Sequence, residues 1–129
     1  MPKTSPAGLY YEVLVSNWLE SQGYKTRIRQ RGKLGEADIV GSKGKLLKKT
    51  LFVECKNKEV VSLLDFHRFV SKFKKFLDDK PKAKGLLVYS DELQSEVKDY
   101  YDNTLESELR DRVGLTRKTR KQLRRYGKL

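Results

Sequence analysis

Leu51-Phe-Val-Glu-Cys-Lys-Asn57 is the stretch of sequence that decides the fold, together with Gly35-Glu-Ala-Asp-Ile-Val-Gly41 shortly before it. Both stretches read as strands, and the basic segment 42–50 joins them as a hairpin loop would. Side chains alternate between the two faces of a strand, so Glu54 and Lys56 share one face. Charges beside a buried strand are costly unless they are paired or bind a metal, which points to a functional site.

The hairpin also places a second carboxylate near Glu54. An antiparallel partner strand that carries Asp38 places this residue beside Glu54. Two carboxylates with hard oxygen atoms and a nearby lysine ammonium suit a divalent cation of the magnesium type. Glu36 shares a strand face with Asp38 and is a reserve ligand. The sequence therefore predicts a metal site on this hairpin.

The spacing of Asp38 and Glu54-x-Lys56 resembles the PD-(D/E)XK nuclease superfamily, and Val53-Glu-Cys-Lys56 resembles its archaeal Holliday-junction resolvase and Mrr-like branches. The resemblance covers roughly residues 5 to 100, although Ala37 stands where the superfamily usually has a proline. It implies an α/β protein with a restriction-endonuclease-like core, in which helices flank a mixed central sheet of about four strands.

The resemblance also implies roles for particular residues. Asp38 and Glu54 would hold Mg²⁺, or Mn²⁺ as a substitute, with help from the backbone carbonyl of Cys55. Lys56 would position the attacking water and offset charge that develops on the phosphate. Glu12 would contribute from the first helix, although without the resemblance it reads as a solvated helix residue.

Composition favours nucleic acid as the partner. The chain has 129 residues, enough for one domain with a single core, and a formal net charge of +12. A polyanion is the natural partner for such a surface, with DNA ahead of a membrane, although basic residues can serve solubility alone. One cysteine excludes a disulfide framework and fits a reducing cytoplasm. No signal peptide or membrane-length apolar span is present, so we expect a soluble, cytoplasmic protein.

Helices flank the predicted strands. Ser5-Pro6 begins a helix that runs to about Gln22. Its expected packing face consists of Tyr10, Val13, Leu14 and Trp18. Ser62 begins a second helix whose phenylalanines form a continuous apolar stripe, with Lys72, Lys74 and Lys75 toward solvent. The segment 85–90 reads as a buried strand parallel to the Glu54 strand, and Asp91 is expected to cap the next helix.

Two basic regions are candidates for phosphate contacts. One is a strand from Tyr24 to Gly32 with its following loop, which presents Arg27, Arg29, Arg31 and Lys33, and which also reads as an edge strand protected by charge. The other is residues 105–129, expected as a helical or disordered extension of a nuclease-like core over residues 1–104. It presents Arg117, Lys118, Arg120, Lys121, Arg124 and Arg125 to phosphates, or it serves only as a solubilising tail.

The predicted function is magnesium-dependent hydrolysis of DNA phosphodiester bonds by an endonuclease, such as a structure-selective junction resolvase. Junction resolution generally needs paired cuts, so a homodimer is possible. The alternative is a nucleic-acid-binding protein that keeps the fold with little or no activity. A third reading is a basic interaction protein in which the Glu54-x-Lys56 pattern is fortuitous.

Overall fold

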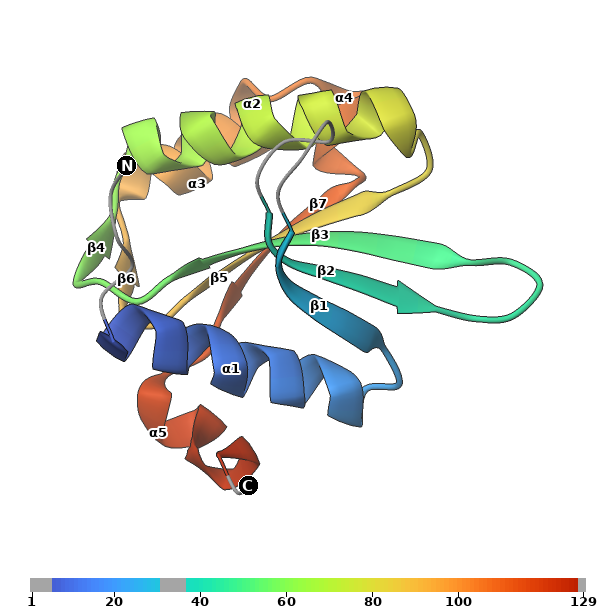
Figure 1. The fold of residues 1–129 in the computed structure, drawn as a ribbon. Coiled ribbons are helices and arrows are strands. Elements are labelled where there is room, and N and C mark those ends of the chain that lie inside the picture. Colours follow the sequence, from blue (N-terminus) through green and yellow to red (C-terminus); the bar gives the residue numbers. More distant parts are fainter. Residues whose placement is uncertain (1–5, 31–36, 128–129) are drawn as a thin grey trace.

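A computed structural model describes residues 6–30 and 37–127, which form a mixed central sheet between two layers of helices (Figure 1). The helices are α1 (Pro6–Ser21), α2 (Leu63–Asp79), α3 (Ser95–Asn103), α4 (Ser107–Arg110), α5 (Arg120–Leu123) and the 3-10 helix η1 (Arg124–Tyr126). The strands are β1 (Lys25–Gln30), β2 (Ala37–Lys43), β3 (Lys49–Lys56), β4 (Val60–Val61), β5 (Lys84–Tyr89), β6 (Glu92–Leu93) and β7 (Val113–Arg117).

The central sheet has the strand order β1-β2-β3-β5-β7. Strands β1, β2 and β3 pair antiparallel through two consecutive hairpins. Strand β5 pairs parallel with β3 after the α2 crossover, and β7 pairs parallel with β5. The predicted α/β fold with a mixed sheet is confirmed, and the sheet has one strand more than expected.

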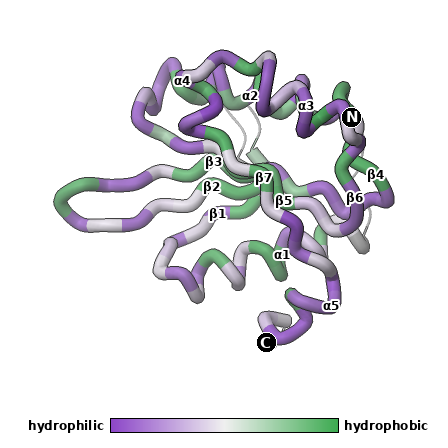
Figure 2. Tube along the Cα trace, turned by 180° about the vertical axis from the view of Figure 1, so that it is seen from behind, coloured by the Kyte–Doolittle hydropathy of each residue, from purple (hydrophilic) through white to green (hydrophobic). Residues whose placement is uncertain are grey.

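The helices divide the core into two clusters, one on each face of the sheet. Helices α2, α3 and α4 cover one face, and α1 and α5 cover the other (Figure 1). Phe52 and Leu87 point toward the α2 layer, whereas Val53 and Val88 point toward α1. Figure 2 shows hydrophobic residues where the central strands run side by side and at the tip of the β2–β3 hairpin, and it shows hydrophobic and hydrophilic residues alternating along the helices. Among the described helices, none is long and apolar enough to cross a membrane.

The two long helices begin close to where the sequence predicts. Ser62 caps α2 in a complete capping box with Asp65, and Phe66, Phe69, Phe73 and Phe76 are buried along its stripe. Helix α1 has its expected bounds, but its buried face differs from the prediction. It consists of Tyr11, Leu14, Val15 and Leu19, whereas Tyr10 is 55% exposed. Apolar residues surround this helix on several sides, so their spacing alone does not fix its rotation.

Residues 105–129 differ most from expectation. The prediction of a helical or disordered extension is wrong for Val113–Arg117, which forms the edge strand β7. Leu105 and Leu109 join the cluster under α2, and Leu123 joins the cluster under α1. These apolar residues stand singly among charged ones, so the segment carries too little local periodicity to identify from its sequence.

The start of α3 also differs from expectation. The predicted cap at Asp91 is wrong, because Glu92 and Leu93 pair in β6 with β4 and α3 begins only at Ser95. This two-stranded ladder lies just beyond the ends of β3 and β5 (Figure 1). The chain therefore makes one further short pairing on leaving the central sheet, beside the end of β3 that carries Glu54 and Lys56.

Candidate active site

The β2–β3 hairpin places Asp38 and Glu54 on neighbouring strands. Ile39 pairs with Val53, so the next antiparallel position sets Asp38 opposite Glu54, on the face that α2 covers. Asp38 is partly buried, and its Oδ2 accepts a hydrogen bond of 2.8 Å from the backbone N–H of Cys55. The two carboxylates are close enough for the charge of Asp38 to raise the pKa of Glu54.

Glu54 is a buried carboxylate held between two lysines. It is 2% exposed, and its Oε1 accepts a hydrogen bond of 2.7 Å from Nζ of Lys72 on α2. Its Oε2 is buried, lies 4.0 Å from Nζ of Lys56 and accepts no hydrogen bond from the described residues. Burial raises the pKa of Glu54 above its usual value, although Lys72 and Lys56 oppose that change.

Asp65, at the first turn of α2, is the second acid beside Lys56. Its Oδ1 lies 4.0 Å from Nζ of Lys56, and its Oδ2 accepts hydrogen bonds of 2.9 Å from Lys58 and from the backbone N–H of Ser62. Burial alone would raise the pKa of Asp65, but the bonds from Ser62 and Lys58 lower it overall. Asp65 is therefore held as a carboxylate, and Lys56 lies between two acids.

Lys72 and Asp65 belong to this cluster although the sequence interpretation missed both. The prediction that Lys72 points to solvent is wrong, because its ammonium group reaches Glu54. The signal was available in the helix periodicity. Asp65, Phe69, Lys72 and Phe76 follow one another at spacings of four, three and four residues, which places them along one side of α2. A charged residue on an otherwise apolar stripe marks a buried partner.

The Mrr_cat family of restriction endonucleases matches residues 6–118 of the chain. The chain belongs to this restriction endonuclease family. Family membership, together with the fold, supports a nuclease. A comparison with curated proteins gives no match.

Solved structures share the fold of this family member at low sequence identity. A protein of unknown function, AF1548, superposes with a TM-score of 0.68 and 17% identity, over 89% of this chain and 64% of that one. A repair endonuclease from Pyrococcus abyssi superposes with a TM-score of 0.59 and 12% identity, over 92% of this chain and 49% of that one. The DNA modification-dependent restriction endonuclease AspBHI superposes with a TM-score of 0.52 and 15% identity, over 98% of this chain and 35% of that one. The chain covers less than two thirds of each of these proteins.

Two further predicted acidic residues of this Mrr_cat chain are Glu12, on α1, and Glu36. Glu12 is buried on α1, which covers the opposite face of the sheet from α2. Within residues 6–30 and 37–127, no group of three or more His, Cys, Asp or Glu side chains is arranged to hold a metal ion. Glu12 therefore does not complete a three-residue set with Asp38 and Glu54. Glu36 lies outside the described residues.

The predicted phosphate-binding residues of this endonuclease-family chain are spread over two edges of the sheet. Arg27 is exposed on β1, whereas Arg31, Lys33 and the side chain of Arg29 lie outside the described part of the chain. Toward the C-terminus, the exposed residues are Arg117, Arg120, Lys121, Arg124 and Arg125. Lys118 is partly buried, with its ammonium 4.8 Å from the centre of the Trp18 ring.

Proposed function

We propose that this chain is a magnesium-dependent endonuclease that hydrolyses phosphodiester bonds in DNA. The observation that carries the proposal is the pair of carboxylates, Asp38 and Glu54, opposite one another on adjacent strands, with the Lys56 ammonium 4.0 Å from Glu54. Its family supports a nuclease, and the net charge of +12 favours a polyanionic substrate.

The carboxylate pair fits a magnesium ion. Mg²⁺ is commonly bound through one or two carboxylates and keeps its other positions for water and substrate phosphate, so a third acidic side chain is not required. Asp38 and Glu54 would hold it, with the backbone carbonyl of Cys55, and Mn²⁺ could substitute. The buried Oε2 of Glu54, which accepts no hydrogen bond from the described residues, is an oxygen suited to a cation. When bound there, such an ion would supply Lewis-acid chemistry, polarising the scissile phosphate and lowering the pKa of a bound water.

The chain's own residues would prepare the reaction. The N–H of Cys55 holds Asp38, and the ammonium of Lys72 holds Glu54, so both carboxylates are fixed before substrate arrives. Lys56 is the group proposed to orient the attacking water and to offset charge on the phosphoryl oxygens. Asp65 is a positioning residue, because it draws the Lys56 ammonium toward the same edge of the sheet. Preorganised charges of this kind act most strongly where water is excluded.

The experiment that tests the proposal is digestion of linear duplex, single strand, flap and four-way junction DNA, with and without Mg²⁺. Cleavage of at least one substrate only when Mg²⁺ is present is the expected result. Binding without cleavage of any of them would favour the alternative, a nucleic-acid-binding protein of the same fold. Paired cuts across a junction would additionally require a symmetric homodimer.

Lys72→Met is expected to lower the free energy of unfolding by roughly 1.5–3 kcal/mol, the usual contribution of a hydrogen bond to a charged group. The reason is that Glu54 would stay buried without its 2.7 Å partner. In a Glu54→Gln background the same change should cost much less, because no buried charge remains. Urea denaturation of the four variants of this cycle measures the coupling, and exposed Lys75→Met is the matched control. Equal losses in both backgrounds would contradict the pairing.

Replacing Arg117, Lys121 and Arg125 together by glutamine is expected to weaken DNA binding most at moderate salt. Each lost phosphate contact reduces the salt slope of duplex binding by about 0.9, so the slope should fall by up to about 2.7. All three side chains are exposed, so the fold should persist, whereas deletion of the segment would also remove buried Leu123. Affinity for one duplex across a salt series measures the slope.

The matched control for this triple variant removes Lys74, Lys75 and Lys80, which are exposed at the far part of α2 and beyond it. It loses the same charge from another surface. An equal change of slope in both variants would show that only net charge matters and that the C-terminal residues make no specific phosphate contacts.

A further inference from the structure

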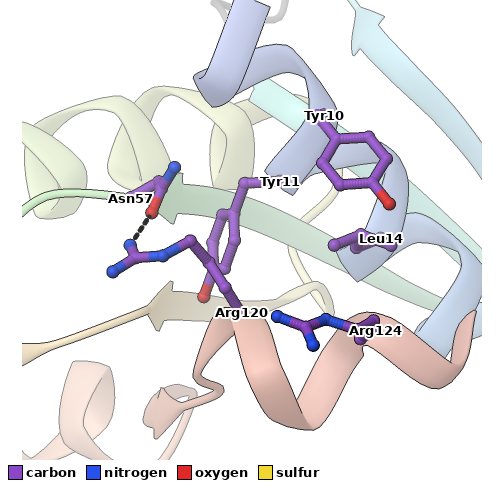
Figure 3. A pocket seen from close by; sticks show the side chains of 6 residues that line it. All are labelled: Tyr10, Tyr11, Leu14, Asn57, Arg120 and Arg124. Atoms are coloured by element: carbon purple, nitrogen blue, oxygen red, sulfur yellow. Dashed lines mark hydrogen bonds between the residues drawn. The ribbon is translucent and has the colours of Figure 1, made fainter. Parts of the chain in front are cut away.

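A pocket of about 230 Å³ lies between α1 and the C-terminal helices, near the carboxyl end of β3 (Figure 3). Its lining consists of Tyr10, Tyr11, Leu14, Asn57, Arg120 and Arg124. Asn57 directly follows Lys56 in the chain, so the pocket lies at the same end of β3 as the proposed active site, on the face of the sheet that α1 covers. Open α/β sheets bind ligands outside the carboxyl ends of their parallel strands, and β3, β5 and β7 all end here.

One wall of the pocket is aromatic and comes from α1. Tyr11 is 1% exposed, and its hydroxyl donates a hydrogen bond of 2.7 Å to the carbonyl of Lys118, which fixes its ring. Tyr10, by contrast, is 55% exposed, so its ring is accessible from solvent. Successive bases of single-stranded nucleic acid stack on exposed aromatic rings of this kind, largely without regard to sequence.

The opposite wall is cationic. Within the described residues, Nη1 of Arg120 contacts Asn57 Oδ1, Ser90 Oγ at 3.3 Å and Asp91 Oδ1 at 3.3 Å. The guanidinium is therefore held in place while Nε and Nη2 keep donors for a ligand. Arg124 follows four residues later, on the same side, and forms no ion pair with any described residue.

We propose that this pocket binds one unpaired nucleotide of the DNA, with its base against Tyr10 and its phosphate on Arg120 and Arg124. The inference rests on the proposed function, because it takes DNA as the substrate. The volume lies below the 300 Å³ at which pockets for larger ligands begin, so it suits one ring system. A site for duplex phosphates alone would need the two arginines but no accessible tyrosine. The nuclease would then favour DNA that offers an unstacked base at the end of β3 that carries Lys56.

The test is DNA binding in EDTA, which does not depend on catalysis and so separates this proposal from the nuclease activity. Three duplexes of one sequence are compared: fully paired, with one bulged nucleotide, and with the same bulge lacking its base. Wild-type protein should bind the bulged duplex most tightly and should lose that preference when the base is absent. Equal affinity for all three duplexes overturns the proposal.

Variants of the pocket assign the preference to its residues. Tyr10→Ala should weaken binding of the bulged duplex by about tenfold, within the range for loss of one base–aromatic stack, and leave the paired duplex nearly unchanged. Tyr10→Phe should retain the preference for the bulged duplex, because it keeps the aromatic ring. The same variant is a control that the fold tolerates substitution at this position. If Tyr10→Ala weakens binding of paired and bulged DNA equally, the proposed contact between Tyr10 and a base is overturned.

The arginine wall is tested against an exposed lysine on another helix. Arg124→Ala should reduce affinity for the bulged duplex several-fold more than Lys75→Ala, which removes the same charge from an exposed site on α2 outside the lining. A free deoxynucleoside monophosphate offers the same chemistry without a strand. We expect it to compete only weakly and only for the bulged duplex. If it binds more tightly than that duplex, or if both charge variants behave alike, DNA is not the occupant.

Discussion

Glu54→Gln is expected to reduce magnesium-dependent DNA cleavage by roughly 1,000-fold, the upper end of the losses seen when one preorganised electrostatic group is removed. The glutamine keeps the shape of the side chain, and its carbonyl can still accept a hydrogen bond from Lys72. What it loses is the negative charge opposite Asp38. The measurement is the rate of cleavage at saturating DNA over a magnesium titration, with DNA binding in EDTA measured in parallel.

Asp38→Asn should behave in the same way, because the two carboxylates are proposed to hold one ion. Binding of DNA without metal should persist in both variants, since fewer negative charges face the phosphates. The matched control is Glu59→Gln, an exposed glutamate just beyond β3. Wild-type rates for Glu54→Gln or Asp38→Asn at saturating Mg²⁺ would contradict the assignment of these residues to the site.

Lys56→Ala is expected to lower turnover by about 100- to 1,000-fold while metal binding persists, because the lysine is proposed to act on the water and the phosphate. Single-turnover cleavage at saturating Mg²⁺ measures the chemical step. Lys58→Ala is a close control, because Lys58 binds the same Asp65 at 2.9 Å but makes no recorded contact with Glu54. A loss far below tenfold for Lys56→Ala, or equal losses for both lysines, would make Lys56 a surface residue.

The hairpin could be predicted because its information is local. The alternation of side chains along Leu51–Asn57 predicts that Phe52 and Glu54 share one face of the strand and that Val53 lies on the other. In the structure Phe52 and Glu54 face α2, and Val53 packs in the cluster under α1. The buried side of α2 could be predicted equally well, because its apolar residues all lie on one side of the helix and Ser62 marks where the helix begins. Such elements are specified by neighbours in the sequence.

The remaining features depend on contacts between distant segments. Lys72 reaches Glu54 across 18 residues, and its burial follows from where α2 crosses the sheet rather than from its immediate neighbours. Strand β7 is short and contains a glycine, and it becomes a strand by pairing with β5. The pocket forms only because α1 and α5 lie side by side, and the residue pattern within either segment does not predict that arrangement.

The joining of the two ends of the chain has a kinetic consequence. Tyr11 bonds to the carbonyl of Lys118, and Asn17 bonds to the carbonyl of Tyr126, across 107 and 109 residues. Contacts of such long range must await closure of nearly the whole chain, and proteins rich in them fold slowly. Helix α1 packs on β1, β2 and β3, which follow it closely in the chain, and also on α5 and η1, which come only after β7. The part of α1 that α5 and η1 cover therefore stays uncovered until those helices have been synthesised, and in that interval its apolar residues are most exposed to aggregation.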